Sequence, residues 1–242
     1  MENRKYKEGL IYLETASTLA PKDPEVLKAL ARGYSGTARP EEAIKALVKA
    51  KALEPKDLEL RRELYRLYRR TGQQREAKQE IEELLKIDPS DNDTRLIYAQ
   101  LLYDEKKYKE AGEAVENIMA TAPSRDALMM LGKIQTAQKD YQQALATYDE
   151  VISMENYAPA LYEKAELFRN YGKQLDKSPK WAETFYERAL RADPEFGLAE
   201  LGLARLQKLW KRDDLYMKHL TNAKRLSPNN PEIMAEWRKA NK

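Results

Sequence analysis

The stretch that decides the fold runs from Pro21 to Pro55 and reads PKDPEVLKALARGYSGTARPEEAIKALVKAKALEP. Its first half carries side chains at i, i+3, i+4 and i+7, which fall on one face of a helix: Leu27, Leu30, Ala31 and Tyr34. Its second half, entered at Pro40, does the same with Ala43, Leu47 and Ala50. A proline just past a helix end stops that helix, because proline has no N–H to donate. The stretch therefore predicts two packed helices closed by a proline.

The same unit recurs along the chain. Prolines stand 34 residues apart at Pro21, Pro55, Pro89 and Pro123, and again at Pro194 and Pro228, while Asn156 stands where the intervening proline would fall. The segments between them repeat the two-helix pattern with small residues where helices must approach closely, notably Ala77, Ala99, Ala111, Ala144, Ala165 and Ala182. An internal period of this length is typical of a repeat protein.

These residues resemble the signature of the tetratricopeptide repeat, with its Leu-Ala or Leu-Gly, Tyr, Ala and closing Pro. Six copies in phase cover nearly the whole chain. The resemblance implies an all-α, right-handed α-solenoid (superhelix) of helix-turn-helix repeats. The pattern departs at Tyr65, Gln135, Gln207 and Tyr216, which predicts local changes in helix spacing. About five extra residues, within 170–179, also separate the two helices of the fifth copy.

We predict a single solenoid over residues 1–242. About six helix pairs fill 24–228, and 231–242 form a C-terminal capping helix with Met234 and Trp237 on one face. The helix within 1–21 is unpaired, because Gly9, Leu13 and Ala16 occupy the slots of a second repeat helix and its first-helix partner is missing.

Composition argues against catalysis. The chain has no Cys and one His, His219, which we expect to be a solvent-exposed bystander. No Gly-rich phosphate loop or nucleophile elbow occurs. We therefore expect no enzyme, cofactor or metal site. No apolar run approaches the ~20 residues that span a bilayer, and we predict a cytoplasmic protein, or a periplasmic or anchored parent if this is a fragment.

In the resembled family the first helices of successive repeats line a concave groove that holds a partner. Transferred to this chain, that geometry predicts a partner-binding groove lined by Lys28, Arg32, Arg62, Arg66, Arg69, Gln100, Tyr103, Met129, Lys133, Tyr162, Arg169 and Arg205. The arginines suit partner carboxylates, while Met129 and the tyrosines suit apolar side chains. Alternatively, Arg62, Arg66 and Arg69 pair with acids on the same surface, such as Glu59 and Glu63.

The leading hypothesis is a non-enzymatic scaffold that binds a protein or peptide with acidic and apolar residues. Self-association through the solenoid ends is the alternative. RNA binding by a helical-repeat array ranks lower, because the net charge is only +3 and residues 90–156 hold twelve acidic against seven basic residues. Phosphate contacts require a basic surface, so no nucleic acid is expected.

Overall fold

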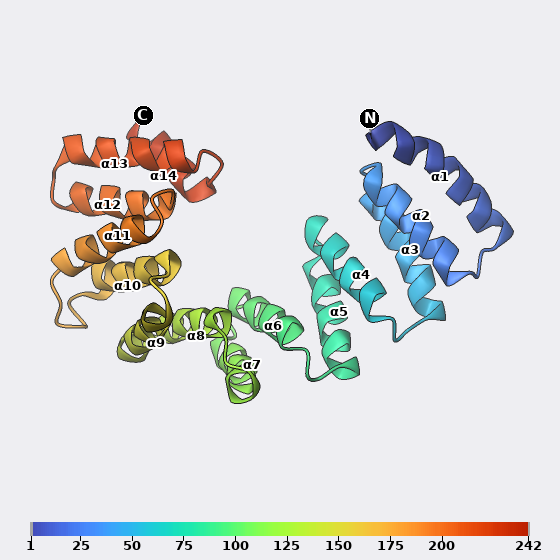
Figure 1. Cartoon of the computed structure of the whole chain (residues 1–242), viewed down its shortest axis with the longest axis horizontal. Helices are drawn as coiled ribbons and strands as arrows, with labels where there is room; N and C mark the ends of the chain where they lie inside the picture. The colour runs from blue at the N-terminus through green and yellow to red at the C-terminus, as the bar shows by residue number, and fades with distance from the viewer. Residues whose placement is uncertain (1, 242) are drawn as a thin grey trace. The chain divides into compact units, whose positions relative to one another are not determined.

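The computed structural model describes residues 2–241, with side chains from residue 8 onward, as helices joined by short turns (Figure 1). No strand occurs in that range, so the all-α prediction is confirmed. Contacts divide the chain into two compact units. Unit 1 extends through Glu105 and unit 2 begins at Lys106. Each is described by itself below.

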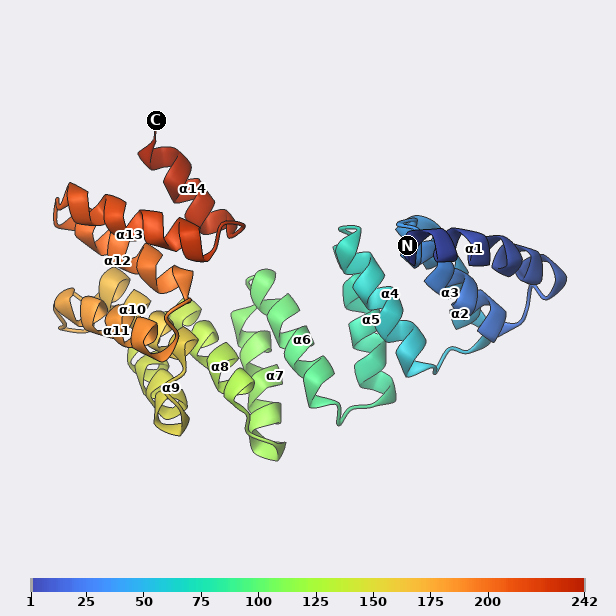
Figure 2. The same cartoon turned by 45° about the horizontal axis from the view of Figure 1, so that its top comes forward.

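Unit 1 contains six helices: α1 (Glu2–Leu19), α2 (Pro24–Gly36), α3 (Pro40–Leu53), α4 (Leu58–Arg70), α5 (Gln74–Ile87) and α6 (Asn92–Asp104). Helices α2 and α3 pack as one pair, and α4 and α5 as another, as the views in Figure 1 and Figure 2 both show. Helix α1 packs on α2, where Gly33 makes room for the methyl groups of Leu10 and Leu13.

Unit 2 contains eight helices: α7 (Tyr108–Thr121), α8 (Arg125–Gln138), α9 (Tyr141–Met154), α10 (Ala158–Tyr171), α11 (Lys180–Ala192), α12 (Gly197–Leu209), α13 (Asp213–Leu226) and α14 (Pro231–Ala240). The pairs are α8 with α9, α10 with α11, and α12 with α13. Helix α14 packs on α13 and covers its apolar face with Ile233, which is fully buried. The single-solenoid layout over the whole chain stays a prediction.

The first helices of the repeats in unit 1 begin at side-chain caps that follow the period. Asp23, Asp57 and Asp91 are 34 residues apart, and each carboxylate accepts from backbone N–H groups in the first turn of α2, α4 or α6. Such caps satisfy N–H groups that have no partner within the helix.

The turn inside each pair also follows the period. Backbone in the left-handed region is found at Ala38, Gly72, Lys106 and Lys139, with φ between 59° and 77°. Only Gly72 is the residue type that adopts this conformation without strain. At Ala38, Lys106 and Lys139 the flanking helices therefore hold the turn in a backbone conformation that the residue itself does not favour.

Close helix contacts depend on small residues, as the pattern predicted. Ala31, Ala99 and Ala165 have no exposed surface. Gly202 of α12 lies against the ring of Tyr186, so that a Cβ placed there would be 2.3 Å from a ring carbon. Tyr65, which replaces the usual small residue, is 6% exposed and stays within the core of unit 1. None of the helices in residues 2–241 is both long and apolar enough to cross a bilayer.

Candidate partner-binding surface

Two of the cations predicted to line the groove form ion pairs between successive repeats. Lys28 Nζ lies 2.9 Å from Glu54 and 3.0 Å from Asp57, and Arg62 lies 2.9 Å from Asp91. The two pairings are equivalent, because Lys28 and Arg62 are 34 residues apart and each reaches the capping aspartate 29 residues further on. We call these contacts the inter-repeat braces.

The inter-repeat braces shift the pKa values of the residues that form them. Hydrogen bonds to Glu25, Glu54 and Asp57 raise the pKa of Lys28. Burial alone would raise the pKa of Asp91, but hydrogen bonds from Thr94 and Arg62 outweigh it and lower that pKa. The brace residues therefore remain charged at neutral pH and are occupied within the fold.

A third cation is structural in a different way. Arg61 is buried, donates to Glu80 at 2.7 Å, and donates twice to the carbonyl oxygen of Pro55. Lys51 forms an ion pair with the same Glu80. This network joins α3, α4 and α5, and its charges are engaged with one another within the fold.

The remaining arginines of α4 are different. Arg66, Arg69 and Arg70 are exposed, and none forms an ion pair within the described residues. Arg69 donates to the hydroxyl of Tyr65 at 3.1 Å and lies over its ring. Together with Tyr65 these arginines line a hollow of about 290 Å³. We call these four residues the arginine surface.

An adjoining hollow of about 380 Å³ lies between α4 and α6. It shares Tyr65 and Arg66 with the arginine surface and adds Ile97 and two acids of α6 and its cap, Asp91 and Asp93. Glu63 of α4 lies close enough to Arg32 and Arg66 for both to affect its pKa. Burial raises the pKa of Glu63 while Arg32 and Arg66 oppose that rise, yet Glu63 forms no direct ion pair with either.

The other predicted residues of unit 1 are placed as follows. Arg32 is exposed, without an ion pair among the described residues. Gln100 is exposed and donates to Asp104 at 2.8 Å, and Tyr103 is half-buried. The alternative that the arginines pair with neighbouring acids therefore holds for Arg62, which also contacts Glu59, and not for Arg66.

In unit 2 the predicted cations are all paired. Lys133 lies 3.7 Å from Glu163, Arg169 bonds Glu166, and Arg205 lies 2.6 Å from Glu232. These pairs link neighbouring first helices or successive turns of one helix. Burial raises the pKa of Glu163, and Lys133 only partly opposes that rise.

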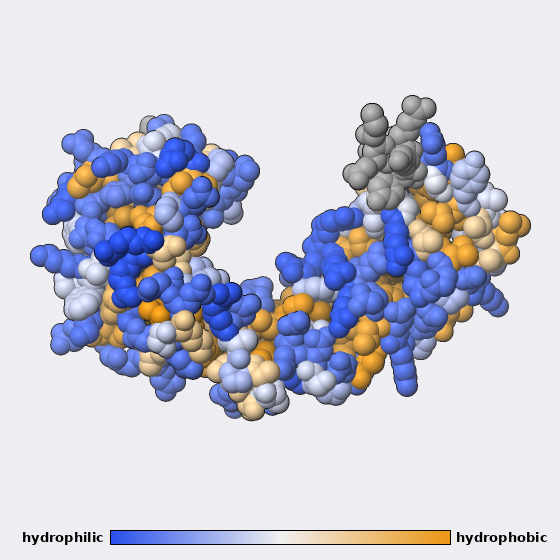
Figure 3. Space-filling view, viewed as in Figure 1, coloured by the Kyte–Doolittle hydropathy of each residue, from blue (hydrophilic) through white to orange (hydrophobic). Residues whose placement is uncertain are grey.

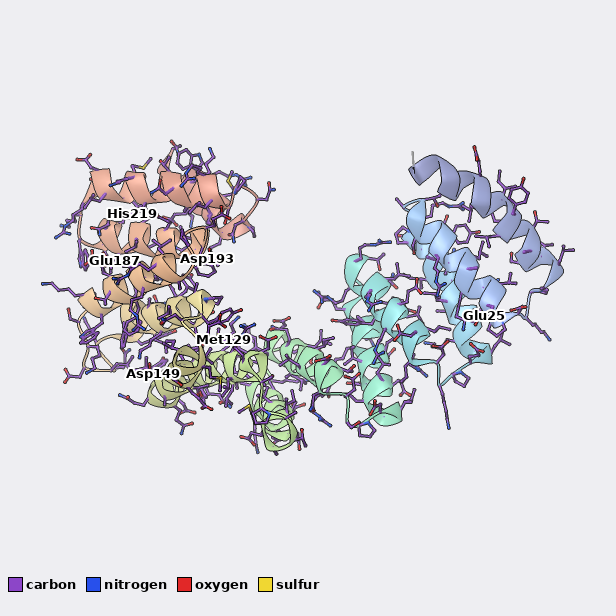
Figure 4. The ribbon with its side chains drawn as sticks, in the orientation of Figure 1. Glu25, Met129, Asp149, Glu187, Asp193 and His219 are labelled. Atoms are coloured by element: carbon purple, nitrogen blue, oxygen red, sulfur yellow. The ribbon has the colours of Figure 1, made fainter. Side chains whose placement is uncertain are left out.

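The predicted apolar section of the groove is not open to solvent. Met129, labelled in Figure 4, and Tyr162 are each 9% exposed and belong to the core of unit 2. The Tyr162 ring contacts Phe196 and Tyr186 at centroid distances of 5.7 and 5.9 Å. Their helices turn these side chains toward neighbouring helices, so they contribute to packing.

His219 is less exposed than predicted. Its side chain is 21% exposed, and Nδ1 lies 2.6 Å from Glu200 of α12. Figure 4 places it on α13. No group of acidic and His side chains within residues 8–241 could hold a metal ion.

Large apolar side chains are exposed elsewhere, most of all on α1 and in unit 2. On α1, Ile11, Tyr12 and Leu19 are 64%, 77% and 81% exposed. In unit 2, apolar patches break the hydrophilic surface over α11–α13 (Figure 3); Trp181 and Leu209 of these helices are 49% and 61% exposed.

The braces could have been found from the sequence. The period that aligns Pro21, Pro55 and Pro89 also aligns Asp23, Asp57 and Asp91, as well as Lys28 with Arg62. A cation and an acid that recur together at a fixed separation indicate a repeated contact.

Comparisons with known proteins agree with this architecture. Residues 70–151, about a third of the chain, match the family of anaphase-promoting complex (cyclosome) subunit 3. A tetratricopeptide-repeat protein from Parabacteroides merdae is 15% identical with a TM-score of 0.74, over 95% of this chain and 90% of that one. PilF of Pseudomonas aeruginosa is 19% identical with a TM-score of 0.60, over 89% and 97%.

The Cut9–Hcn1 hetero-tetramer of the anaphase-promoting complex is 15% identical with a TM-score of 0.62; the match covers 99% of this chain and 46% of that one. A comparison with curated protein sequences gave no match. The period, the helix pairs and these similar folds agree on one conclusion: the chain has the tetratricopeptide-repeat fold.

Proposed function

We propose that this chain is a non-catalytic scaffold that binds an acidic segment of a partner protein on the arginine surface of α4. The observation that carries the proposal is the pair Arg66 and Arg70. They are exposed beside a hollow, whereas the braces neutralise Lys28 and Arg62. Like charges one helical turn apart repel each other, and a partner carboxylate would relieve that repulsion.

The chemistry of the surface favours a carboxylate. A guanidinium donates two parallel hydrogen bonds that match a carboxylate. Tyr65 already holds Arg69 in place, which lowers the entropy lost when a partner is bound. Ile97 in the adjoining hollow offers a contact for an apolar side chain next to the acid.

The same hollow disfavours nucleic acid. Glu59, Asp91 and Asp93 line it beside Arg66, so the basic surface is confined to a few arginines and does not continue along a path for successive phosphates. The comparisons lean the same way, because the matched family and the Cut9–Hcn1 structure are named for protein assemblies.

Site-specific cross-linking tests the proposal. A photoreactive residue at position 66 should capture a partner protein in the source cells, and the same residue at position 75 should not, since Arg75 is an exposed arginine on the second helix of the pair. Equal capture at both positions would argue against this surface.

Calorimetry then measures the contribution of charge. Arg66→Glu with Arg70→Glu should weaken binding of the captured partner about tenfold and flatten its salt dependence, because exposed pairs contribute about 0.2–1 kcal/mol each. Arg75→Glu is the matched control. Unchanged binding by the double variant would refute the proposal.

Self-association is a second candidate. Ile11, Tyr12 and Leu19 on α1 favour it, because three large side chains are mostly exposed within nine residues of one helix. Exposed apolar patches often mark association surfaces.

A further inference from the structure

Two departures from the repeat pattern meet at one edge of unit 2. The insertion between α10 and α11 and the turn between α12 and α13 both contribute to a hollow of about 370 Å³. Ser178, Pro179, Lys180 and Glu183 line it from the insertion side, and Trp210 and Arg212 from the turn.

The insertion is fixed in place. Leu175 at its centre is 4% exposed and belongs to the core of unit 2. The N–H of Lys177 donates to the carbonyl of Gly172 at 2.8 Å. At Gly172 a Cβ would lie 2.6 Å from the carbonyl oxygen of Phe168 and 2.7 Å from that of Lys177, so no larger residue fits. The wall of the hollow is therefore formed before any partner arrives.

Gln207 organises the opposite wall. It stands in the slot that holds an aromatic residue in other copies, and it is 3% exposed. Its amide nitrogen donates to Glu183 at 3.2 Å, and its amide oxygen is 3.5 Å from Arg212. A polar residue in an aromatic slot thus joins α11 to the turn that carries Arg212.

The hollow presents cations and an aromatic ring together. The Arg212 guanidinium lies 5.2 Å from the centre of the Trp210 ring, which is within the range of a cation–π contact. Neither Lys180 nor Arg212 forms an ion pair among the side chains of residues 8–241. The one acid in the hollow, Glu183, is engaged by Gln207.

Large exposed apolar side chains stand next to two lining residues in the sequence. Trp181 follows Lys180 and is 49% exposed, and Leu209 precedes Trp210 and is 61% exposed. Tryptophan is among the residues that contribute most to protein interfaces. Two cations against one acid therefore favour a carboxylate, and the apolar neighbours favour an apolar side chain next to it.

We infer that this edge, which we call the tryptophan edge (Lys180, Trp181, Leu209, Trp210 and Arg212), is a second docking surface. It binds a short segment of a partner protein in which Asp or Glu neighbours a large apolar residue. The surface is built from the start of α11, the end of α12 and the turn that follows α12, and it shares no residue with the arginine surface of unit 1.

The test uses a displayed library of random 12-residue peptides selected on the full chain. Enriched peptides that bind here should combine an acid with a large apolar residue. Lys180→Glu with Arg212→Glu should weaken them at least about tenfold. Trp181→Ala should weaken them as well.

Two controls keep the surfaces apart. Lys173→Glu makes the same charge change on an exposed residue of the insertion and should leave binding unchanged. Arg66→Glu with Arg70→Glu should also leave these peptides bound, whereas peptides held by the arginine surface would be lost. Failure of one surface is thus distinguishable from failure of the other.

Three results would overturn the inference. The first is that no enriched peptide depends on Lys180 and Arg212. The second is that the dependent peptides carry no acid, and the third is that Lys173→Glu weakens them equally. If the glutamate variant does not fold, as judged by circular dichroism, Lys180→Gln with Arg212→Gln takes its place with the same expected loss.

Discussion

Replacing Arg61 by Met should lower the free energy of unfolding of the α4–α5 region by about 2–3 kcal/mol. Arg61 and Glu80 have side chains only 9% and 5% exposed, and their charged atoms are 2.7 Å apart. Removing one member of a buried ion pair costs about 3–5 kcal/mol, because the other charge is left without its partner. Lys51 still faces Glu80 in this variant, so we expect a loss at or just below the lower end of that range.

The reverse change should be more damaging. Glu80→Met removes the acid that both Arg61 and Lys51 contact. Arg61 would keep only the carbonyl of Pro55, whereas Lys51, with 27% of its side chain exposed, can reach water. We expect a loss of about 3–4 kcal/mol.

The double variant Arg61→Met with Glu80→Met decides whether the two residues act as a pair. It leaves no buried charge, so it should cost no more than the larger single change. Denaturant unfolding should be combined with hydrogen exchange of the α4 and α5 amides, because repeat arrays can unfold in parts. A double loss equal to the sum of the two single losses would refute the reasoning. The exposed pair Lys86–Glu83 is the control, and its removal should change little.

Three further outcomes are expected. Gly202→Ala should lose about 1–3 kcal/mol by overpacking, whereas Gly112→Ala, whose Cβ would meet only one atom at 3.9 Å, should gain about 0.5–1 kcal/mol; equal shifts in thermal unfolding would contradict the packing at α12. Because the folded-state pKa of Glu163 is raised, its contribution to stability falls as pH rises through that pKa. Glu163→Gln should thus stabilise the protein at pH 7 and lose this advantage below about pH 4, and a constant difference in chemical unfolding would count against it. Ile11→Ser with Leu19→Ser should abolish any concentration-dependent association in sedimentation, and a wild-type chain that stays monomeric at high concentration would rule that association out.

Much of the candidate site could not be predicted from the pattern. Arg62 and Arg66 look alike in the sequence, since both are arginines on the first helix of one repeat. Arg62 forms an ion pair with Asp91, 29 residues away, whereas Arg66 forms none with the acids near it. Which cation is neutralised depends on where the next helix begins in space, and spacing within one helix does not contain that information.

The predicted exposure of two groove residues is wrong for a related reason. Met129 and Tyr162 were assigned to an open face by transfer of the repeat geometry, yet each is 9% exposed. A helix rotated by one residue turns a side chain through about 100°, so a small error in phase moves it from a groove to the core. The hollow at the tryptophan edge depends in the same way on Gln207, whose partners come from two other segments.

The sequence by itself determined the helices, their pairing and their ends. Small residues at helix contacts and prolines after the helices are local signals. The 34-residue period repeats these signals along the chain. Only the tertiary structure decided which charges remain available, where the insertion packs and which apolar side chains stay exposed. Those properties depend on distances between side chains far apart in sequence, and such distances exist only once the helices have packed.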